Sequence, residues 1–147
     1  MHSLEKYADV ISSIPFNKTI GLKIDSIEKD LLIMSFENRE ELIGNYVHGI
    51  LHGGVISSVL DMAGGAAAMA AVVMKHPKKS LEHLAEILGK SSTVNLHIDF
   101  LRPGRGKIFT AKSHVIRSGN KISVTRMELF NEKSSLIATG TGTYMIA

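Results

Sequence analysis

The chain has 147 residues, of which 44% are hydrophobic and 21% charged, with a net charge of +3 and no cysteine. This composition is that of an ordinary globular domain, and it excludes a disulfide framework, a thiolate nucleophile and a thiolate metal site. Aromatic residues are only 5%, so platforms for stacking nucleic-acid bases are scarce, and the modest positive charge suits an anionic small molecule. We expect a single domain over residues 1–147 in the reducing cytoplasm.

The first half of the chain is predicted to contain a short helix, two strands and a long helix. Residues 2–12 carry apolar side chains at helical spacing, and Pro15 closes that helix. Alternating apolar residues over 21–37 predict two strands. A polar, glycine-containing loop over 38–53 then leads into a helix from about 53 to 74.

The second half is predicted to contain one short helix and four strands. Residues 80–88 begin with a serine and continue with apolar side chains at helical spacing. An unbroken alternation then predicts a strand whose apolar face comprises Val94, Leu96, Ile98 and Phe100. Three further strands are predicted at 107–117, 121–131 and 134–146. The order of elements favours an α+β fold, in which an antiparallel sheet packs against one dominant helix and its edges favour oligomers.

The long helix also has the length of a membrane span. Residues 55–74 contain no lysine, arginine or histidine, but only nine of the twenty are strongly apolar, and Asp61 lies among them. A carboxylate in the bilayer interior costs about 2.5–3.5 kcal/mol on insertion scales. We therefore interpret the segment as a helix buried inside a globular domain.

Asp61 is the most unusual residue of the sequence, because no basic residue occurs between His52 and Lys75 to pair with it locally. An unpaired buried carboxylate is expensive, which makes it a candidate catalytic group. Small residues share its helix face and leave room for a ligand or another backbone: Gly54, Ser57, Ser58, Gly64, Gly65 and Ala68. The alternatives are a pair with an arginine elsewhere in the fold, or a solvated position.

His52-Gly53-Gly54 stands directly before this helix. Two glycines at a helix start let a ligand approach the backbone, and their free N–H groups would stabilise a developing oxyanion. The alternatives are a simple glycine turn and a core histidine bonded to a carbonyl.

Taken in order, these motifs resemble the PaaI-like branch of the hotdog thioesterases. The resemblance rests on His52-Gly53-Gly54 with Asp61 nine residues after the histidine, on the strand 93–103 that ends in Leu-Arg-Pro, on the basic turn 117–121 and on the closing strand around 138–141. It extends from Phe16 to Tyr144 and is greatest to the YigI-type members. It implies a hotdog fold, an antiparallel sheet wrapped around one long central helix. It also implies hydrolysis of acyl-CoA to free acid and coenzyme A without cofactor or metal, in a homotetramer built from two dimers.

In that family the site lies between two subunits, and the resemblance implies the following roles. Asp61 is the general base or the nucleophile, and the Gly53 N–H of the facing subunit polarises the thioester carbonyl. His52 helps to hold the thioester, and Thr93 orients the attacking water. Asn45 lies near the position of a supporting asparagine, in a loop that is one residue longer here.

Gly54 at the helix start is a further substrate-binding candidate, and the coenzyme A phosphates would be met by basic side chains of the turns. The basic candidates are Arg102, Arg105, Lys107, Arg117 and Lys121. Ordinary solvated turns are the alternative. The apolar flanks of the helix indicate acyl chains of medium or greater length; these flanks are Val55, Val59, Met62 and Met69. Residues 78–90 either cover the acyl tunnel or simply pack on the sheet.

Three other functions were weighed against thioester hydrolysis. His48 and His52 are four residues apart, but a glycine lies between them and no third zinc ligand is apparent. A hotdog hydratase would carry a histidine five residues after the aspartate, where this chain has Ala66. A non-catalytic acyl-CoA sensor or regulator is the main rival, although the residues before Pro15 are too few for a helix-turn-helix.

Overall fold

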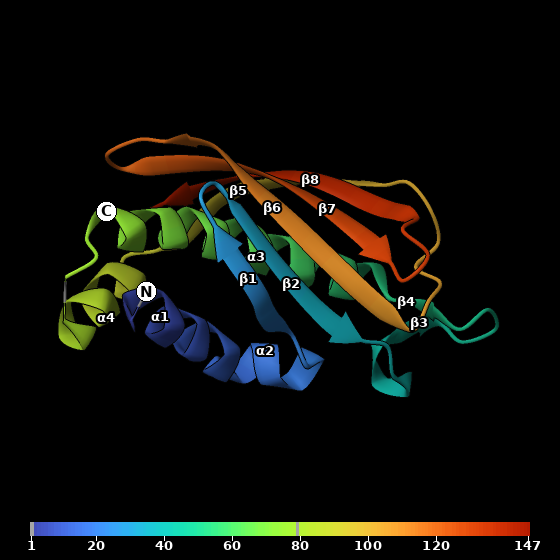
Figure 1. The fold of residues 1–147 in the computed structure, drawn as a ribbon. Coiled ribbons are helices and arrows are strands. Elements are labelled where there is room, and N and C mark those ends of the chain that lie inside the picture. Colours follow the sequence, from blue (N-terminus) through green and yellow to red (C-terminus); the bar gives the residue numbers. More distant parts are fainter. Residues whose placement is uncertain (1, 79) are drawn as a thin grey trace.

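The computed structural model of the chain describes residues 2–78 and 80–147, which form an antiparallel sheet curved around one long helix (Figure 1). The helices are α1 (His2–Ser13), α2 (Pro15–Ile20), α3 (Gly53–Lys75) and α4 (Leu81–Gly89). The strands are β1 (Lys23–Glu28), β2 (Leu31–Glu37), β3 (Ile43–Asn45), β4 (Ile50–Leu51), β5 (Ser92–Phe100), β6 (Ile108–Ser118), β7 (Ile122–Asn131) and β8 (Leu136–Met145). The large sheet has the order β1-β2-β6-β7-β8-β5, and β3 and β4 form a small separate pair. This is the α+β arrangement expected of a hotdog fold.

The predicted loop 38–53 is more ordered than expected. It contains β3, β4 and a short 3-10 helix, Glu40–Leu42. The backbone N–H of Leu51 donates to the Gly104 carbonyl (3.0 Å), and that of His52 donates to the Leu42 carbonyl (2.9 Å). These bonds fix the chain immediately before α3, so the start of the long helix is held in place.

Helix α3 is the centre of the core. By length and composition it could cross a membrane, but 61% of its most apolar window is buried inside the protein. Its alanines and glycines let the helix backbone lie close to the sheet, and larger side chains such as Leu60 and Met69 fill the space between them. The prediction of a buried helix rather than a membrane span therefore fits the packing.

The first helix ends before Pro15 as predicted, but Pro15 also begins a second short helix that was not predicted. Pro15 is the first residue of α2, a position where its missing N–H costs nothing and its fixed φ favours the helix. Gly21 ends α2 in the left-handed conformation (φ 78°). Both signals are present in the sequence, but six residues are too few to show a helical repeat.

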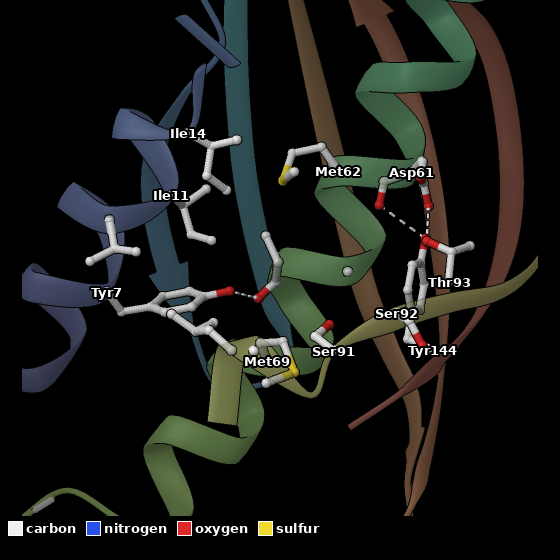
Figure 2. Close-up of a pocket in the computed structure, with 15 residues that line it drawn as sticks. Tyr7, Ile11, Ile14, Asp61, Met62, Met69, Ser91, Ser92, Thr93 and Tyr144 are labelled. Carbon is white, nitrogen blue, oxygen red and sulfur yellow. Dashed lines mark hydrogen bonds between the residues drawn. The ribbon is translucent and has the colours of Figure 1, made fainter. Parts of the chain in front are cut away.

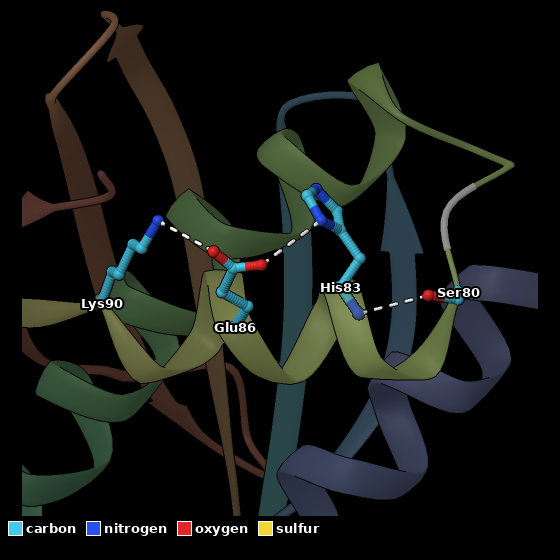
Figure 3. A network of polar contacts seen from close by, with 4 residues as sticks. All are labelled: Ser80, His83, Glu86 and Lys90. Atoms are coloured by element: carbon cyan, nitrogen blue, oxygen red, sulfur yellow. Dashed lines mark hydrogen bonds and ion pairs between the residues drawn. The ribbon is translucent and has the colours of Figure 1, made fainter.

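Helix α4 confirms the short helix predicted at 80–88, and its start is capped as expected. The Ser80 hydroxyl accepts a hydrogen bond from the His83 backbone N–H at 3.3 Å (Figure 3). The Glu86 carboxylate lies 3.4 Å from Lys90 Nζ and 3.7 Å from His83 Nδ1. Such solvated ion pairs add little stability, so buried Leu84 is what anchors α4. Position 79, within the segment predicted to cover the tunnel, lies outside the described residues.

Strand β5 contains a bulge that corrects its predicted apolar face. Thr93 pairs with Tyr144 and Asn95 with Thr143, so Val94 is an extra residue between them. Because a bulge reverses the alternation, Thr93 takes the inner face and Val94 is half exposed. The sequence alternation had placed Val94 in the core.

Helix α1 runs antiparallel to α3 and packs against both α3 and the edge strand β1 (Figure 1). The Tyr7 hydroxyl donates to the Ala66 carbonyl (2.6 Å), and the Ser3 hydroxyl donates to the Pro77 carbonyl (2.8 Å). Tyr7 is fully buried, and this burial raises the pKa of its phenol far above the usual 10.0. The phenol therefore stays protonated in the folded protein and holds α1 against α3.

This buried phenol predicts a loss of stability in alkali. Above pH 10 the unfolded chain releases the Tyr7 proton while the folded chain keeps it, so the free energy of unfolding should fall by about 1.4 kcal/mol per pH unit from this residue. Below pH 10 this contribution is fully present. Tyr7→Phe should cost about 1 kcal/mol at pH 8 and show a shallower decline above pH 10 in urea unfolding. Equal slopes in both proteins would contradict the prediction.

Candidate functional site

Asp61 and Thr93, which are 32 positions apart, meet on the inner side of β5. The Thr93 hydroxyl donates to Asp61 Oδ1 at 2.9 Å (Figure 2). The bulge of β5 is what turns Thr93 toward α3, and Asp61 is half-buried on the facing side of that helix. Two predicted site residues therefore lie together.

Tyr144 is a third member of this cluster, and the sequence interpretation missed it. Its hydroxyl donates to the Asp61 backbone carbonyl at 3.1 Å. Burial first, and then the Asp61 carboxylate, raise the pKa of Tyr144, so the phenol remains a donor. A Cβ on Gly64 would collide with the Tyr144 hydroxyl, and one on Gly142 would collide with its ring.

The small-residue face of α3 is thus partly occupied, which corrects its interpretation as room for a ligand. Gly64 accommodates the Tyr144 hydroxyl. Gly65 borders the ring of the same tyrosine, since a Cβ there would lie 3.3 Å from it, and also lines open space. The sequence did contain a signal for this contact: the glycine pair 64–65 in the helix and the aromatic Tyr144 near the end of the last strand.

An apolar pocket of about 450 Å³ extends from Asp61 and Thr93. Asp61, Thr93 and Tyr144 lie on one side of it, and on the other lie Tyr7 and Ile11 of α1 with Ile14 directly after that helix (Figure 2). Helix α3 contributes Asp61, Met62, Gly65, Ala66 and Met69, and the end of α4 contributes Leu88 and Gly89. The predicted flanks Met62 and Met69 line this pocket. Val59 is buried in the core instead, and Val55 does not border the pocket.

His52 and Gly53 lie at the start of α3, away from this pocket. His52 Nδ1 accepts the Gly54 N–H at 2.7 Å, so the histidine caps the helix and Gly54 is not a free donor as had been predicted. The Gly53 N–H has no acceptor among the described residues. Eight residues of helix separate Gly53 from Asp61, about 12 Å along the axis. One chain alone does not bring them together.

Asn45 also lies outside the pocket. Its Oδ1 accepts the backbone N–H groups of Val47 (3.2 Å) and His48 (3.4 Å), which shapes the exposed turn between β3 and β4. His48 belongs to this turn, and His52 is the residue that caps the start of α3. Across residues 2–78 and 80–147, no three histidine or carboxylate side chains come together in a way that could hold a metal ion.

Four of the five predicted phosphate-binding cations, all except Lys107, fall into two groups at opposite ends of α3. Arg102 donates to the Leu136 carbonyl (2.8 Å) and Arg105 to the His48 carbonyl (3.3 Å), near the start of the helix. Arg117 and Lys121 flank the β6–β7 turn, where Ser118 accepts from Lys75 at the helix end (3.1 Å). All four are exposed, and one chain does not gather them around a single ligand.

Comparison with known proteins gives consistent matches. Residues 48–138 match the model of the thioesterase superfamily. The medium/long-chain acyl-CoA thioesterase YigI of Escherichia coli K12 is 41% identical over 133 residues, covering 90% of this chain and 86% of that protein. A crystal structure from Shewanella oneidensis, described as related to the thioesterase superfamily, superimposes with a TM-score of 0.92 at 43% identity, covering 99% of this chain and 96% of that one. The PaaI protein of Escherichia coli shares the fold at 20% identity, with a TM-score of 0.78 over 99% of this chain and 94% of that one.

Proposed function

The chain belongs to the thioesterase superfamily, and on that premise we propose that it hydrolyses acyl-CoA thioesters to the free acid and coenzyme A at Asp61. The family that the ordered motifs predicted is confirmed, as is the hotdog fold. The observation that supports Asp61 is its carboxylate, held by the Thr93 hydroxyl at 2.9 Å at the rim of an apolar pocket. A nucleophile or base at one end and space for an acyl chain beyond it are what the reaction requires.

Asp61 can act in either of two ways. As a general base it takes a proton from water, which then attacks the thioester carbonyl; as a nucleophile it attacks the carbonyl itself. The Thr93 hydroxyl donates to Asp61, so its lone pairs remain available to accept a hydrogen bond from the attacking water. Either route develops negative charge on the carbonyl oxygen, and that oxygen needs a donor.

The donor in this proposal is the Gly53 N–H of a second subunit. Strand β5 is an edge of the large sheet, with Thr93 near its start and Phe100 at its end. The Phe100 ring lies beside Gly53, 3.5 Å from where a Cβ on that glycine would be. If two copies of β5 pair antiparallel about a two-fold axis, the Thr93 end of one strand lies beside the Phe100 end of the other. Each Asp61 then faces a partner Gly53, and each dimer has two sites.

The same pairing explains the divided cations. Arg102 and Arg105 follow the end of β5, whereas Lys121 lies near the start of β5. The Lys121 carbonyl accepts the N–H of Ile146, and the neighbouring Met145 of β8 pairs with Ser92, the first residue of β5. Antiparallel strands would bring the Arg102 end of one subunit to the Lys121 end of the other. The two groups would then flank one coenzyme A, with arginine giving the better phosphate geometry. We place this dimer, and a tetramer of two such dimers, in the cytoplasm.

The decisive experiment is turnover of acyl-CoA by the purified protein, followed as release of free thiol. The relative from Escherichia coli is named a medium/long-chain acyl-CoA thioesterase, so chains from four to eighteen carbons should be tested together with aromatic acyl groups. Binding without thiol release would support an acyl-CoA sensor instead. Binding of duplex DNA at physiological salt would point to a regulator.

Thr93→Val tests the hydrogen bond to Asp61. Losing a hydrogen bond to a charged group costs about 1.5–3 kcal/mol, so kcat should fall by roughly 10- to 100-fold with KM nearly unchanged. Thr93→Ser keeps the hydroxyl and should retain most of the turnover. Thr141→Val, an exposed threonine on β8, serves as the matched control. Equal kcat in the valine and serine variants would remove Thr93 from the mechanism.

A further inference from the structure

Some residues that line the pocket beside Asp61 lie outside the segment that matches the family. The matched segment covers residues 48–138, whereas α1 and Tyr144 lie outside it. One side of the pocket nevertheless comes from α1, through Tyr7, Val10 and Ile11, and from Ile14 directly after it. Part of the pocket's apolar lining therefore comes from residues to which the thioesterase match assigns nothing.

The pocket follows one stripe of α3 away from the carboxylate. Asp61, Gly65 and Met69 lie one helical turn apart in succession, so the stripe is about 12 Å long. Gly65 has no side chain to obstruct it, and Ala66 has only a methyl group. Apart from the Tyr7 phenol, the charged and hydroxyl groups that border the pocket belong to Asp61 of α3, to Tyr144 of β8 and to the segment 91–93, which leads from α4 into β5.

Three helices meet at the other end of this stripe. Tyr7 of α1 and Met69 of α3 are 0% and 2% exposed, and Leu88 of α4 lies against them in the pocket wall. The Tyr7 hydroxyl is already bonded to the Ala66 carbonyl, so it presents its ring to the pocket rather than a free polar group. This end is lined mainly by buried apolar side chains, with Ser91 beside Met69, and it is held by a specific hydrogen bond.

We propose that this pocket binds the acyl chain of the thioester, and that Tyr7 and Met69 set the chain length by closing its far end. The proposal rests on the proposed function, because it takes Asp61 as the reacting end. An extended carbon chain advances about 1.2 Å per bond, a third of the ~3.6 Å that three backbone bonds span in an extended peptide. A pocket of about 12 Å therefore takes on the order of ten carbons. Helix α1 and the end of α4 are specificity elements in this arrangement.

The test is the dependence of kcat/KM on chain length, measured as thiol release over even-numbered acyl-CoAs from four to eighteen carbons. Each methylene that becomes buried should raise kcat/KM by about fourfold until the chain reaches Tyr7 and Met69. Beyond roughly ten carbons the gain should stop. A flat profile from four to eighteen carbons would overturn the proposal.

Two variants change the pocket in opposite directions. Met69→Ala removes three heavy atoms from the far end and should move the optimum to chains about three carbons longer. Val10→Trp adds bulk at a lining position that is 41% exposed, where the fold tolerates it, and should lower the ratio of ten-carbon to four-carbon kcat/KM by more than tenfold. Phe16→Trp, at an exposed position outside the lining, is the matched control. Profiles that match the unmodified protein in both pocket variants would overturn the proposal.

Failure of this proposal is distinguishable from failure of the proposed function. If no acyl-CoA releases thiol, the proposal of hydrolysis is wrong. The pocket is then tested by measuring the binding of decanoate by calorimetry. Decanoate should bind the unmodified protein and Phe16→Trp, and its affinity should fall at least tenfold in Val10→Trp. Equal decanoate binding by all three proteins would rule out the pocket as the acyl site, with or without turnover.

Discussion

Asp61→Asn should lower kcat by about 10²–10⁴, the scale expected for loss of a general base. Asparagine keeps the size of the side chain and can still accept the Thr93 hydrogen bond at Oδ1. It removes proton acceptance and nearly all nucleophilicity. KM should change little, because the proposal assigns the coenzyme A phosphates to basic side chains and the acyl chain to the pocket. Stability should change by less than about 1 kcal/mol, since the lost charge is only half-buried.

The measurement is steady-state thiol release at saturating acyl-CoA, with unfolding in urea to verify the fold. Asp99→Asn is the matched control, because Asp99 is an exposed carboxylate on β5 whose partner is His97 at 3.3 Å. It should retain normal kcat. Near-normal turnover by Asp61→Asn would show that the carboxylate is structural, and the mechanism proposed above would then be wrong.

The position of Asp61 could be predicted because it depends on one chain segment. A single carboxylate in an uncharged helix is a local anomaly, and a helix of that length can be recognised from composition alone. The four strands after the helix were likewise predicted within about two residues from alternation. Local periodicity was therefore enough for the long helix, for the four strands after it and for singling out Asp61, but not for α2, β3 or β4.

The remainder of the site depends on register and on contacts between distant segments. Thr93 reaches Asp61 because one bulged residue reverses the alternation of β5, and alternation alone put Val94 on that face. Tyr144 fits because Gly64 leaves a gap 80 positions earlier in the chain. Helix α1 was predicted, but its periodicity does not reveal that Tyr7 and its neighbours would face a pocket rather than the sheet. Tertiary packing decides each of these.

Gly53 was predicted from the sequence as the oxyanion donor, but within a single chain it lies apart from Asp61. The separation of about 12 Å along α3 is fixed by helix geometry, so no rearrangement within the helix can remove it. Either Gly53 is only the first residue of a helix, or its N–H acts on a thioester bound to another subunit. The edge strand β5 and the contact of Gly53 with Phe100 favour the second alternative.

Gly53→Pro should lower kcat by about 10²–10³, the scale for removing one oxyanion donor. Proline deletes the N–H and is favoured at this first helical position, and His52 already has the extended conformation (φ −61°, ψ 136°) that must precede a proline. Gly53→Ala keeps the N–H, and its Cβ would meet Phe100 at an ordinary 3.5 Å, so it should keep most of the turnover. Equal losses in the two variants would indicate crowding rather than a missing donor.

Mixing the two inactive proteins tests whether the donor comes from the partner. In a dimer of one Asp61→Asn and one Gly53→Pro subunit, a site shared between subunits combines both defects at one position and neither at the other. Random reassociation should therefore restore about a quarter of normal turnover, because half of the dimers are mixed and each has one intact site. If Asp61 and Gly53 acted within one chain, every site would carry a defect and the mixture would stay inactive. Recovery after unfolding and refolding the two proteins together, but not separately, would place the two residues on opposite sides of the subunit interface.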